Sequence, residues 1–313
     1  MTVMKGKTID WMFLCIILVK LVVTIGVTVL FMISNGAITL AIVPNLILSE
    51  LLLVIPALIF VAATRTRLRD VVSFRKIQFK TILMIIVLVY LSMPLITVIN
   101  AISMMFTENV VATISTDILK MPFLTMLFLM GIYGPVCEEL VFRGLMYTGY
   151  KKSASILQAM LLSALLFGLM HMNLNQALYA FVIGCILVLL KEATDSIWAP
   201  IIFHVVFNSH TVILLYVTER WMPNLPSEAV QEAMTGKMML ITISVYMVIA
   251  MITTALGWCV LVWIAEHEHR TRDFGEIQNG FTVGKRKTLT APLLMSIILC
   301  VAYIGFDFLL SHL

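Results

Sequence analysis

Long apolar stretches separated by short polar segments constrain this chain more than any other feature. A helix that crosses a bilayer needs about 20 apolar residues, and its backbone polar groups must be satisfied within the segment. Charged residues make up only 12% of the chain, against about 25% in soluble domains. The nine apolar runs are 11–33, 37–63, 81–103, 122–147, 154–171, 175–191, 197–217, 238–263 and 290–311. They predict an all-α, polytopic transmembrane bundle of about eight or nine spans, forming a single membrane domain over residues 1–313.

The placement of lysine and arginine predicts the orientation of the bundle. Lys5 and Lys7 precede the first run, which is longer than a signal-peptide core and has no cleavage site after it, so it reads as a retained span. With the N-terminus in the cytoplasm, 16 of the basic residues between runs fall on the inner side and 3 on the outer side. This bias is typical of cytoplasmic loops. It predicts a multi-pass protein of the bacterial cell membrane with a cytoplasmic N-terminus.

Two loops and the overall charge pattern complete the outline. The outer segments 104–120 and 218–237 are long enough for short amphipathic helices. No basic stripe is interleaved with aromatic residues, which argues against a nucleic-acid partner. The expected surroundings are the lipid bilayer, and the sequence indicates no oligomeric state.

The sequence contains no CxxC pair. The cysteines are therefore expected to be small buried apolar side chains.

Charged and polar residues inside the apolar runs point to a site. A charged side chain at a helix centre costs about 2.5–3.5 kcal/mol on insertion scales, so it usually faces a cavity or a partner. In GPVCEELVFRG, residues 134–144, Glu139 and Arg143 lie four apart and can pair on one helix face. Glu138 points about 100° away. It is the candidate general base, whereas the Glu139–Arg143 pair reads as a structural clamp.

Two histidine motifs follow on later runs. FGLMH places His171 one turn after Phe167, and a lone histidine at a helix end is more often packed or interfacial than functional. HVVFN places His204 and Asn208 on one helix face. These two side chains could present two donors to a developing oxyanion, or form an interhelical hydrogen-bond pair.

Together, EExxxR, FxxxH and HxxxN, in this order and each on a membrane helix, resemble the Abi family, also called the CAAX protease and bacteriocin-processing family. The resemblance covers about residues 122–217, which would form the catalytic core. It implies a helical bundle around a polar intramembrane cavity, without a cofactor. It also implies that Glu138 and His171 activate water, while His204 and Asn208 stabilise the tetrahedral intermediate. Glu139, Arg143 and Phe167 would support them.

The implied function is that of an intramembrane glutamate-type endopeptidase, similar to type II CAAX prenyl endopeptidases. Its partner would be a membrane-associated peptide or protein, either prenylated and CAAX-like or a leader or pheromone peptide. A non-proteolytic scaffold, immunity or regulatory protein is the alternative. Zinc is a second mechanistic possibility, because Glu138, His171 and His204 make a two-histidine, one-carboxylate set.

The depth of His171 raises a geometric question. A full helix over residues 154–171 would carry His171 to the outer surface, away from Glu138 and His204. Either this helix is tilted and starts higher, or it ends within the membrane, and we favour the second. The stretch HMNLNQ, residues 171–176, would then be non-helical and line a cavity, where such backbone is tolerated.

Overall fold

The chain folds as a bundle of long helices. The computed structural model describes residues 6–107, 109–221, 236–271, 274–275 and 290–310. Within these residues, eight helical stretches are long and apolar enough to cross a membrane, judged by length and composition. They are α1 (Gly6–Ile33), α2 (Ile42–Ala63), α4 (Phe79–Ser103), the continuous stretch Phe123–Lys151, α11 (Leu174–Thr194), α12 (Trp198–Trp221), α14 (Gly236–His267) and α16 (Ala291–Leu310). With no strand in the described part of the chain, the predicted all-α polytopic bundle is confirmed.

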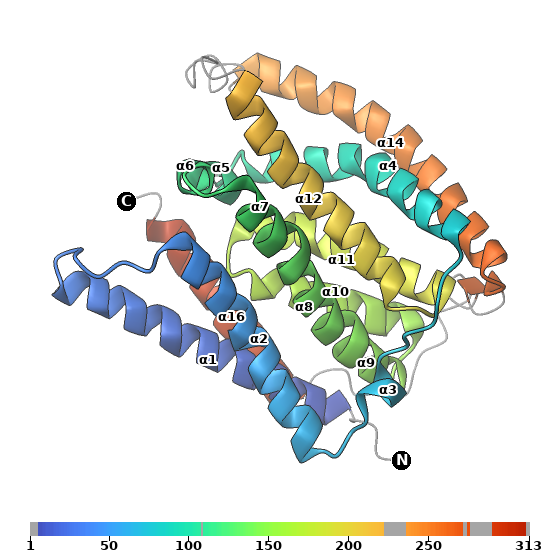
Figure 1. Ribbon diagram of the computed structural model, residues 1–313, viewed down its shortest axis with the longest axis horizontal. Helices are drawn as coiled ribbons and strands as arrows, with labels where there is room; N and C mark the ends of the chain where they lie inside the picture. Colours follow the sequence, from blue (N-terminus) through green and yellow to red (C-terminus); the bar gives the residue numbers. More distant parts are fainter. Residues whose placement is uncertain (1–5, 108, 222–235, 272–273, 276–289, 311–313) are drawn as a thin grey trace.

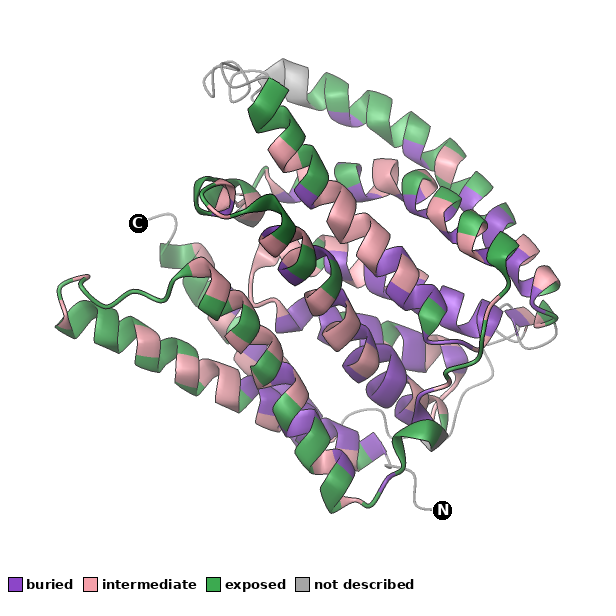
Figure 2. Cartoon of the chain, in the orientation of Figure 1, coloured by how far each residue is buried: buried purple, intermediate pink, exposed green. Residues whose placement is uncertain are grey.

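The helices form two flanking groups around a central one (Figure 1). On one flank α1 packs against α2 and α16, and on the other α4 packs along α14. Between them, α11 contacts α4, α12 and α14. Buried residues concentrate on the central helices, whereas the loop-proximal half of α1 and the outer side of α14 are largely exposed (Figure 2). The site described below lies in the central group.

The stretch Phe123–Lys151 is helical throughout but is not a uniform α-helix. It runs α7 (Phe123–Met126), π-helical η1 (Leu127–Tyr133), α8 (Gly134–Glu139), π-helical η2 (Leu140–Tyr147) and α9 (Thr148–Lys151). Pro135, at the start of α8, has no N–H to donate and interrupts the regular hydrogen-bond ladder. Such π-helical insertions often occur at functional sites. The two carboxylates of the EExxxR motif lie between them.

The helix that carries the FxxxH motif is short. α10 (Ile156–Met170) has 15 residues, or about 22 Å, less than the roughly 30 Å of the hydrocarbon core. It forms a close hairpin with α11, since a Cβ added at Gly168 would lie 2.6 Å from the Ala177 carbonyl oxygen. The helix is thus shorter than a membrane span, and its end within the membrane stays a prediction. The expected non-helical stretch was too long, because Asn173 caps α11 and the chain is helical again from Leu174.

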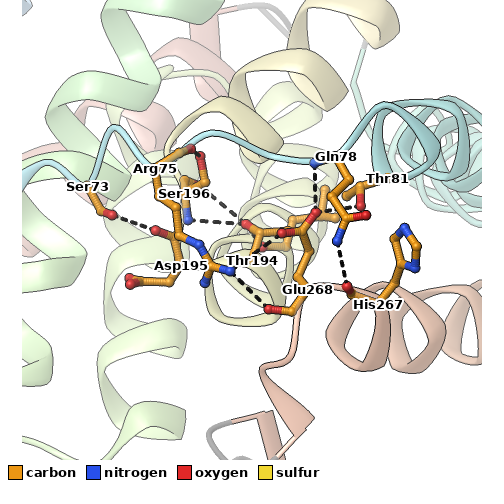
Figure 3. Close-up of polar contacts among 10 residues, drawn as sticks. Ser73, Arg75, Gln78, Thr81, Thr194, Asp195, Ser196, His267 and Glu268 are labelled. Carbon is orange, nitrogen blue, oxygen red and sulfur yellow. Dashed lines mark hydrogen bonds and ion pairs between the residues drawn. The ribbon is translucent and has the colours of Figure 1, made fainter.

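A polar network closes the end of the bundle between α3 (Leu68–Val71) and α4 (Figure 3). Buried Glu268, just after α14, accepts hydrogen bonds from the Gln78 backbone N–H at 2.9 Å and the Thr81 hydroxyl at 2.6 Å. Arg75 donates to the Glu268 carbonyl at 3.1 Å. Ser73 and Ser196 add bonds between this segment and the α11–α12 turn. The network therefore joins α4, α12 and α14 at one end.

The remaining predictions have mixed outcomes. Segment 104–120 contains two short helices, α5 (Val110–Thr113) and α6 (Ser115–Leu119), as expected. The second predicted outer helix falls mostly on residues 222–235, outside the described residues. The expectation of buried cysteines is wrong for Cys259, which lies on the exposed side of α14. The single membrane domain with a core at 122–217 stays a prediction.

Candidate functional site

Glu139 lies at the centre of a buried polar cluster. Its Oε1 accepts a hydrogen bond from Arg143 Nη1 at 2.9 Å and another from His204 Nδ1 at 2.8 Å. The side chains of Glu139 and Arg143 are 0% exposed and that of His204 is 5% exposed. The i,i+4 pair expected from the sequence is therefore present. Glu139 also holds the histidine of a distant helix, α12, which the sequence did not indicate.

His204 connects the two neighbouring carboxylates. Because the Glu139 carboxylate can only accept, His204 Nδ1 carries a hydrogen. The opposite nitrogen, Nε2, faces Glu138 Oε2 at 3.6 Å. The Glu138 side chain keeps 12% exposure, whereas Glu139 has none. The two glutamates thus differ in environment. Glu139 is held in the packed interior, whereas Glu138 borders accessible space.

The aromatic ring of Phe167 organises the groups around it. The Arg143 guanidinium lies over the ring, 4.3 Å from its centroid. The rings of His171 and His204 meet it edge-on, with centroids at 5.1 and 5.9 Å. A cation over an aromatic face and edge-to-face ring pairs are both attractive. One buried side chain therefore orients Arg143 and both histidines.

His171 caps α10, and its ring contacts Phe167, the side chain that also contacts Arg143 and His204. Its Nδ1 donates to the Phe167 carbonyl at 2.8 Å, which leaves Nε2 as an acceptor in the neutral ring. His171 lies within electrostatic range of Glu138 and His204. The early end of α10 is what brings this histidine to the depth of the other two motifs.

Asn208 makes a contact that the sequence did not indicate. Its side chain donates to the Met130 carbonyl at 3.2 Å. The cause is local: Gly134 N–H bonds to Leu129, and the next residue, Pro135, has no N–H for the Met130 carbonyl. Asn208 supplies the missing donor. An amide nitrogen has two hydrogens, so one remains for a ligand.

Two further charged residues near the site were missed by the sequence reasoning. Lys20 of α1 and Glu50 of α2 both fall inside predicted apolar runs, and their charge was the same signal that singled out Glu138. Each of the three lies within electrostatic range of the other two. Glu50 packs against the start of α8, with its Oε1 3.7 Å from where a Cβ at Gly134 would lie. The absence of a side chain at Gly134 makes room for this carboxylate.

The ligand set proposed for zinc is not assembled. In the part of the chain that the structure describes, no three His, Cys, Asp or Glu side chains are grouped to hold a metal ion. His204 already uses Nδ1 on Glu139 and turns Nε2 toward Glu138. His204 is therefore engaged with protein groups, and metal dependence becomes a question for a chelator.

Comparisons with known proteins agree with the motifs. Residues 120–210, which contain all three, match the family "Type II CAAX prenyl endopeptidase Rce1-like". The chain is also similar to "Putative membrane peptidase YdiL" of Bacillus subtilis (strain 168), with 30% identity over 89 residues. That match covers 28% of this chain and 36% of the relative, about a third of its length. No solved structure matches the chain. The three motifs thus lie in the segment that matches this family model, and the similarity to the CAAX protease and bacteriocin-processing family is shown for that segment.

Proposed function

We propose that the chain is an intramembrane endopeptidase that hydrolyses a peptide bond with water activated by Glu138. The observation that carries this proposal is the contact between Glu138 and His204, whose other ring nitrogen is held by buried Glu139. A base and an electrophilic donor thus lie side by side, fixed by a positioning carboxylate. These are the parts that hydrolysis requires.

In the proposed reaction, Glu138 takes a proton from water while the water oxygen bonds to the carbonyl carbon of the peptide. His171 Nε2 accepts a hydrogen bond from the second O–H of that water and holds the water in place. The resulting oxyanion receives hydrogen bonds from His204 Nε2–H and from the remaining Asn208 N–H. The C–N bond then breaks, and Glu138 passes its proton to the leaving amine.

This assignment requires His204 to carry a hydrogen on both ring nitrogens. Nδ1–H is fixed by Glu139, so donation from Nε2 makes the ring an imidazolium. Its positive charge lies between the Glu138 and Glu139 carboxylates. Arg143 balances the second carboxylate. With all four groups ionised, the cluster is neutral overall, which reduces the cost of placing them inside a membrane.

The substrate class follows from the family and from the location of the site. We propose a membrane-associated peptide or protein, either prenylated near its end and CAAX-like or a leader-type apolar peptide. We place the protein in the bacterial cell membrane, with its N-terminus in the cytoplasm.

The experiment uses purified protein in liposomes and two internally quenched peptides. One carries an S-farnesyl cysteine followed by three residues; the other is an unprenylated apolar leader-type peptide. Cleavage of either by the wild type is expected, and Glu138→Gln should lower kcat about 10²–10⁴-fold at normal yield. Glu192→Gln, a carboxylate outside the site, is the matched control and should retain activity.

One outcome would change the proposed mechanism, and another would change the proposed function. A chelator that abolishes activity, with recovery on adding zinc, would replace the metal-free mechanism with a metal-dependent one. A Glu138→Gln protein that still performs its cellular role, together with no cleavage by wild type, would favour the scaffold or immunity function.

A further inference from the structure

A cavity lined by both polar and apolar side chains separates the first two helices of the bundle. It has a volume of about 380 Å³ and lies between the second half of α1 and the first half of α2. Figure 1 shows these two helices diverging toward the loop that joins them. The polar side chains that line the cavity are Lys20, Thr24, Thr28, Thr39, Asn45 and Ser49. Such a lining is unusual between two helices whose other surfaces are apolar.

Lys20 occupies the inner end of this cavity, near the middle of α1. Within the described residues its ammonium makes no hydrogen bond and no ion pair within 4 Å. It nevertheless lies within electrostatic range of Glu50, Glu138 and His171. Lys20 therefore stands between the cavity and the candidate catalytic groups, with three unused N–H donors.

Glu50 offers the complementary group. Its Oε2 is buried and has no hydrogen-bond partner among the described residues. Its Oε1 lies beside Gly134, one helical turn before Glu138. A buried carboxylate oxygen left without a donor is costly, and such atoms in folded proteins usually have a partner. Lys20 thus brings donors to the cavity, and Glu50 brings an acceptor to the start of α8, the helix that carries Glu138.

A peptide substrate in a membrane needs this combination of groups. A protease cleaves an extended segment, whose backbone N–H and C=O groups are not paired as they are in a helix. In hydrocarbon each unpaired group costs several kcal/mol, so extended backbone is tolerated only inside protein or in a polar cavity. Hydroxyl, amide, ammonium and carboxylate side chains could form hydrogen bonds with these backbone groups.

We propose that the α1–α2 cavity is the groove that binds the substrate peptide in extended form and leads it to Glu138. Lys20 donates to a backbone carbonyl of the peptide, and Glu50 accepts from a backbone N–H. This inference rests on the proposed peptidase function and deepens it. It assigns peptide binding to α1 and α2, which lie outside the segment 120–210 that carries the family motifs.

The simpler reading is that Lys20 only balances the negative charge of Glu50 and Glu138. The two readings differ for a double variant. If Lys20 and Glu50 are only counter-ions, replacing both preserves the charge balance and should restore what either single change loses. If both bind the peptide, the double variant loses two contacts and binds no better than the single variants.

Kinetics with the cleaved peptide test this difference. Lys20→Met and Glu50→Leu should each raise KM about tenfold or more with a much smaller change in kcat, and the double variant should be at least as impaired. Lys20→Arg and Glu50→Gln keep a donor and an acceptor and should be milder. Recovery in the double variant, or losses confined to kcat, would overturn the proposal in favour of charge balance.

A steric pair tests the groove itself. Thr24→Trp fills the cavity, whereas Ile25→Trp places the same ring one residue away on the 58% exposed surface that does not line it. We expect a raised KM for the first and near wild-type kinetics for the second. Equal kinetics in both variants would contradict the groove.

Photolabelling makes the result independent of turnover. Both peptides, each with a diazirine residue, are crosslinked to the Glu138→Gln protein, and the labelled residues are mapped. Label on residues 20–31 and 38–52, lost in Thr24→Trp but not in Ile25→Trp, supports the groove. Label elsewhere refutes the groove even if the wild type cleaves the peptides. Label in the groove with no cleavage by wild type refutes the peptidase function instead.

Discussion

Removing Glu139 should destabilise the protein far more than removing Glu139 and Arg143 together. In Glu139→Leu, Arg143 remains charged and 0% exposed, and its Nε and Nη2 already lack partners in the described structure. Breaking a buried ion pair from one side costs about 3–5 kcal/mol, whereas apolar replacement of both partners is often neutral. Arg143→Met should cost less than Glu139→Leu, because Glu139 keeps its bond to His204.

The measurement is thermal unfolding of the purified variants in detergent. At about 2 °C per kcal/mol for a chain of this size, Glu139→Leu should lower Tm by about 6–10 °C. The Glu139→Leu/Arg143→Met double variant should recover most of this loss. Glu192→Leu is the comparison, and its loss should be smaller because its partner Lys151 is 36% exposed and reaches water.

Activity separates the two roles of Glu139. The stable double variant should remain inactive, because His204 Nδ1 has lost the carboxylate that orients it. Glu139→Gln should be the mildest change, since a single oxygen, Oε1, makes both contacts and glutamine retains one. A double variant as unstable as Glu139→Leu would refute the ion-pair reasoning. A fully active double variant would refute the positioning role.

Three other perturbations follow from the packing and the charge pattern. Gly168→Val places a side chain 2.6 Å from a carbonyl oxygen of α11 and should lower both stability and activity, while Gly26→Val, with nothing within 4 Å, should not. Phe167→Leu removes the ring shared by the guanidinium and both histidines, and should lower kcat more than it changes KM in a peptide-cleavage assay. In intact cells an impermeant maleimide should label Met105→Cys but not Leu68→Cys, both exposed positions; the reverse pattern would invert the predicted orientation.

The helical spans were predictable because the requirement behind them is local. A stretch must be apolar over about 20 residues to cross a bilayer, and eight such helices are present. The Glu139–Arg143 pair was predictable for the same reason, since a spacing of four brings two side chains together on any helix. The short α10 relates to a different constraint: His171 could reach the other motifs if its helix were tilted or ended early, and the sequence did not decide between the two.

Contacts that depend on tertiary packing were not predictable. The bond from His204 to Glu139 joins residues 65 positions apart and requires the relative rotation of α8 and α12. The bond from Asn208 to Met130 depends on the π-helical pattern before Pro135, which no propensity indicates. Lys20 and Glu50 are a different case. Their charge inside apolar runs was visible in the sequence, and only their proximity to the site required the structure.

At the turn between α10 and α11, His171 caps the end of a helix as well as contributing an imidazole to the site. A helix that ends away from water leaves carbonyls with no solvent to bond, and His171 Nδ1 supplies a donor to one of them. Alanine at this position removes both the hydrogen bond to the helix carbonyl and the imidazole. Asparagine and glutamine can still donate to that carbonyl while lacking the ring, so they report on water activation alone. At this position, the choice of substitution decides whether an experiment measures folding or catalysis.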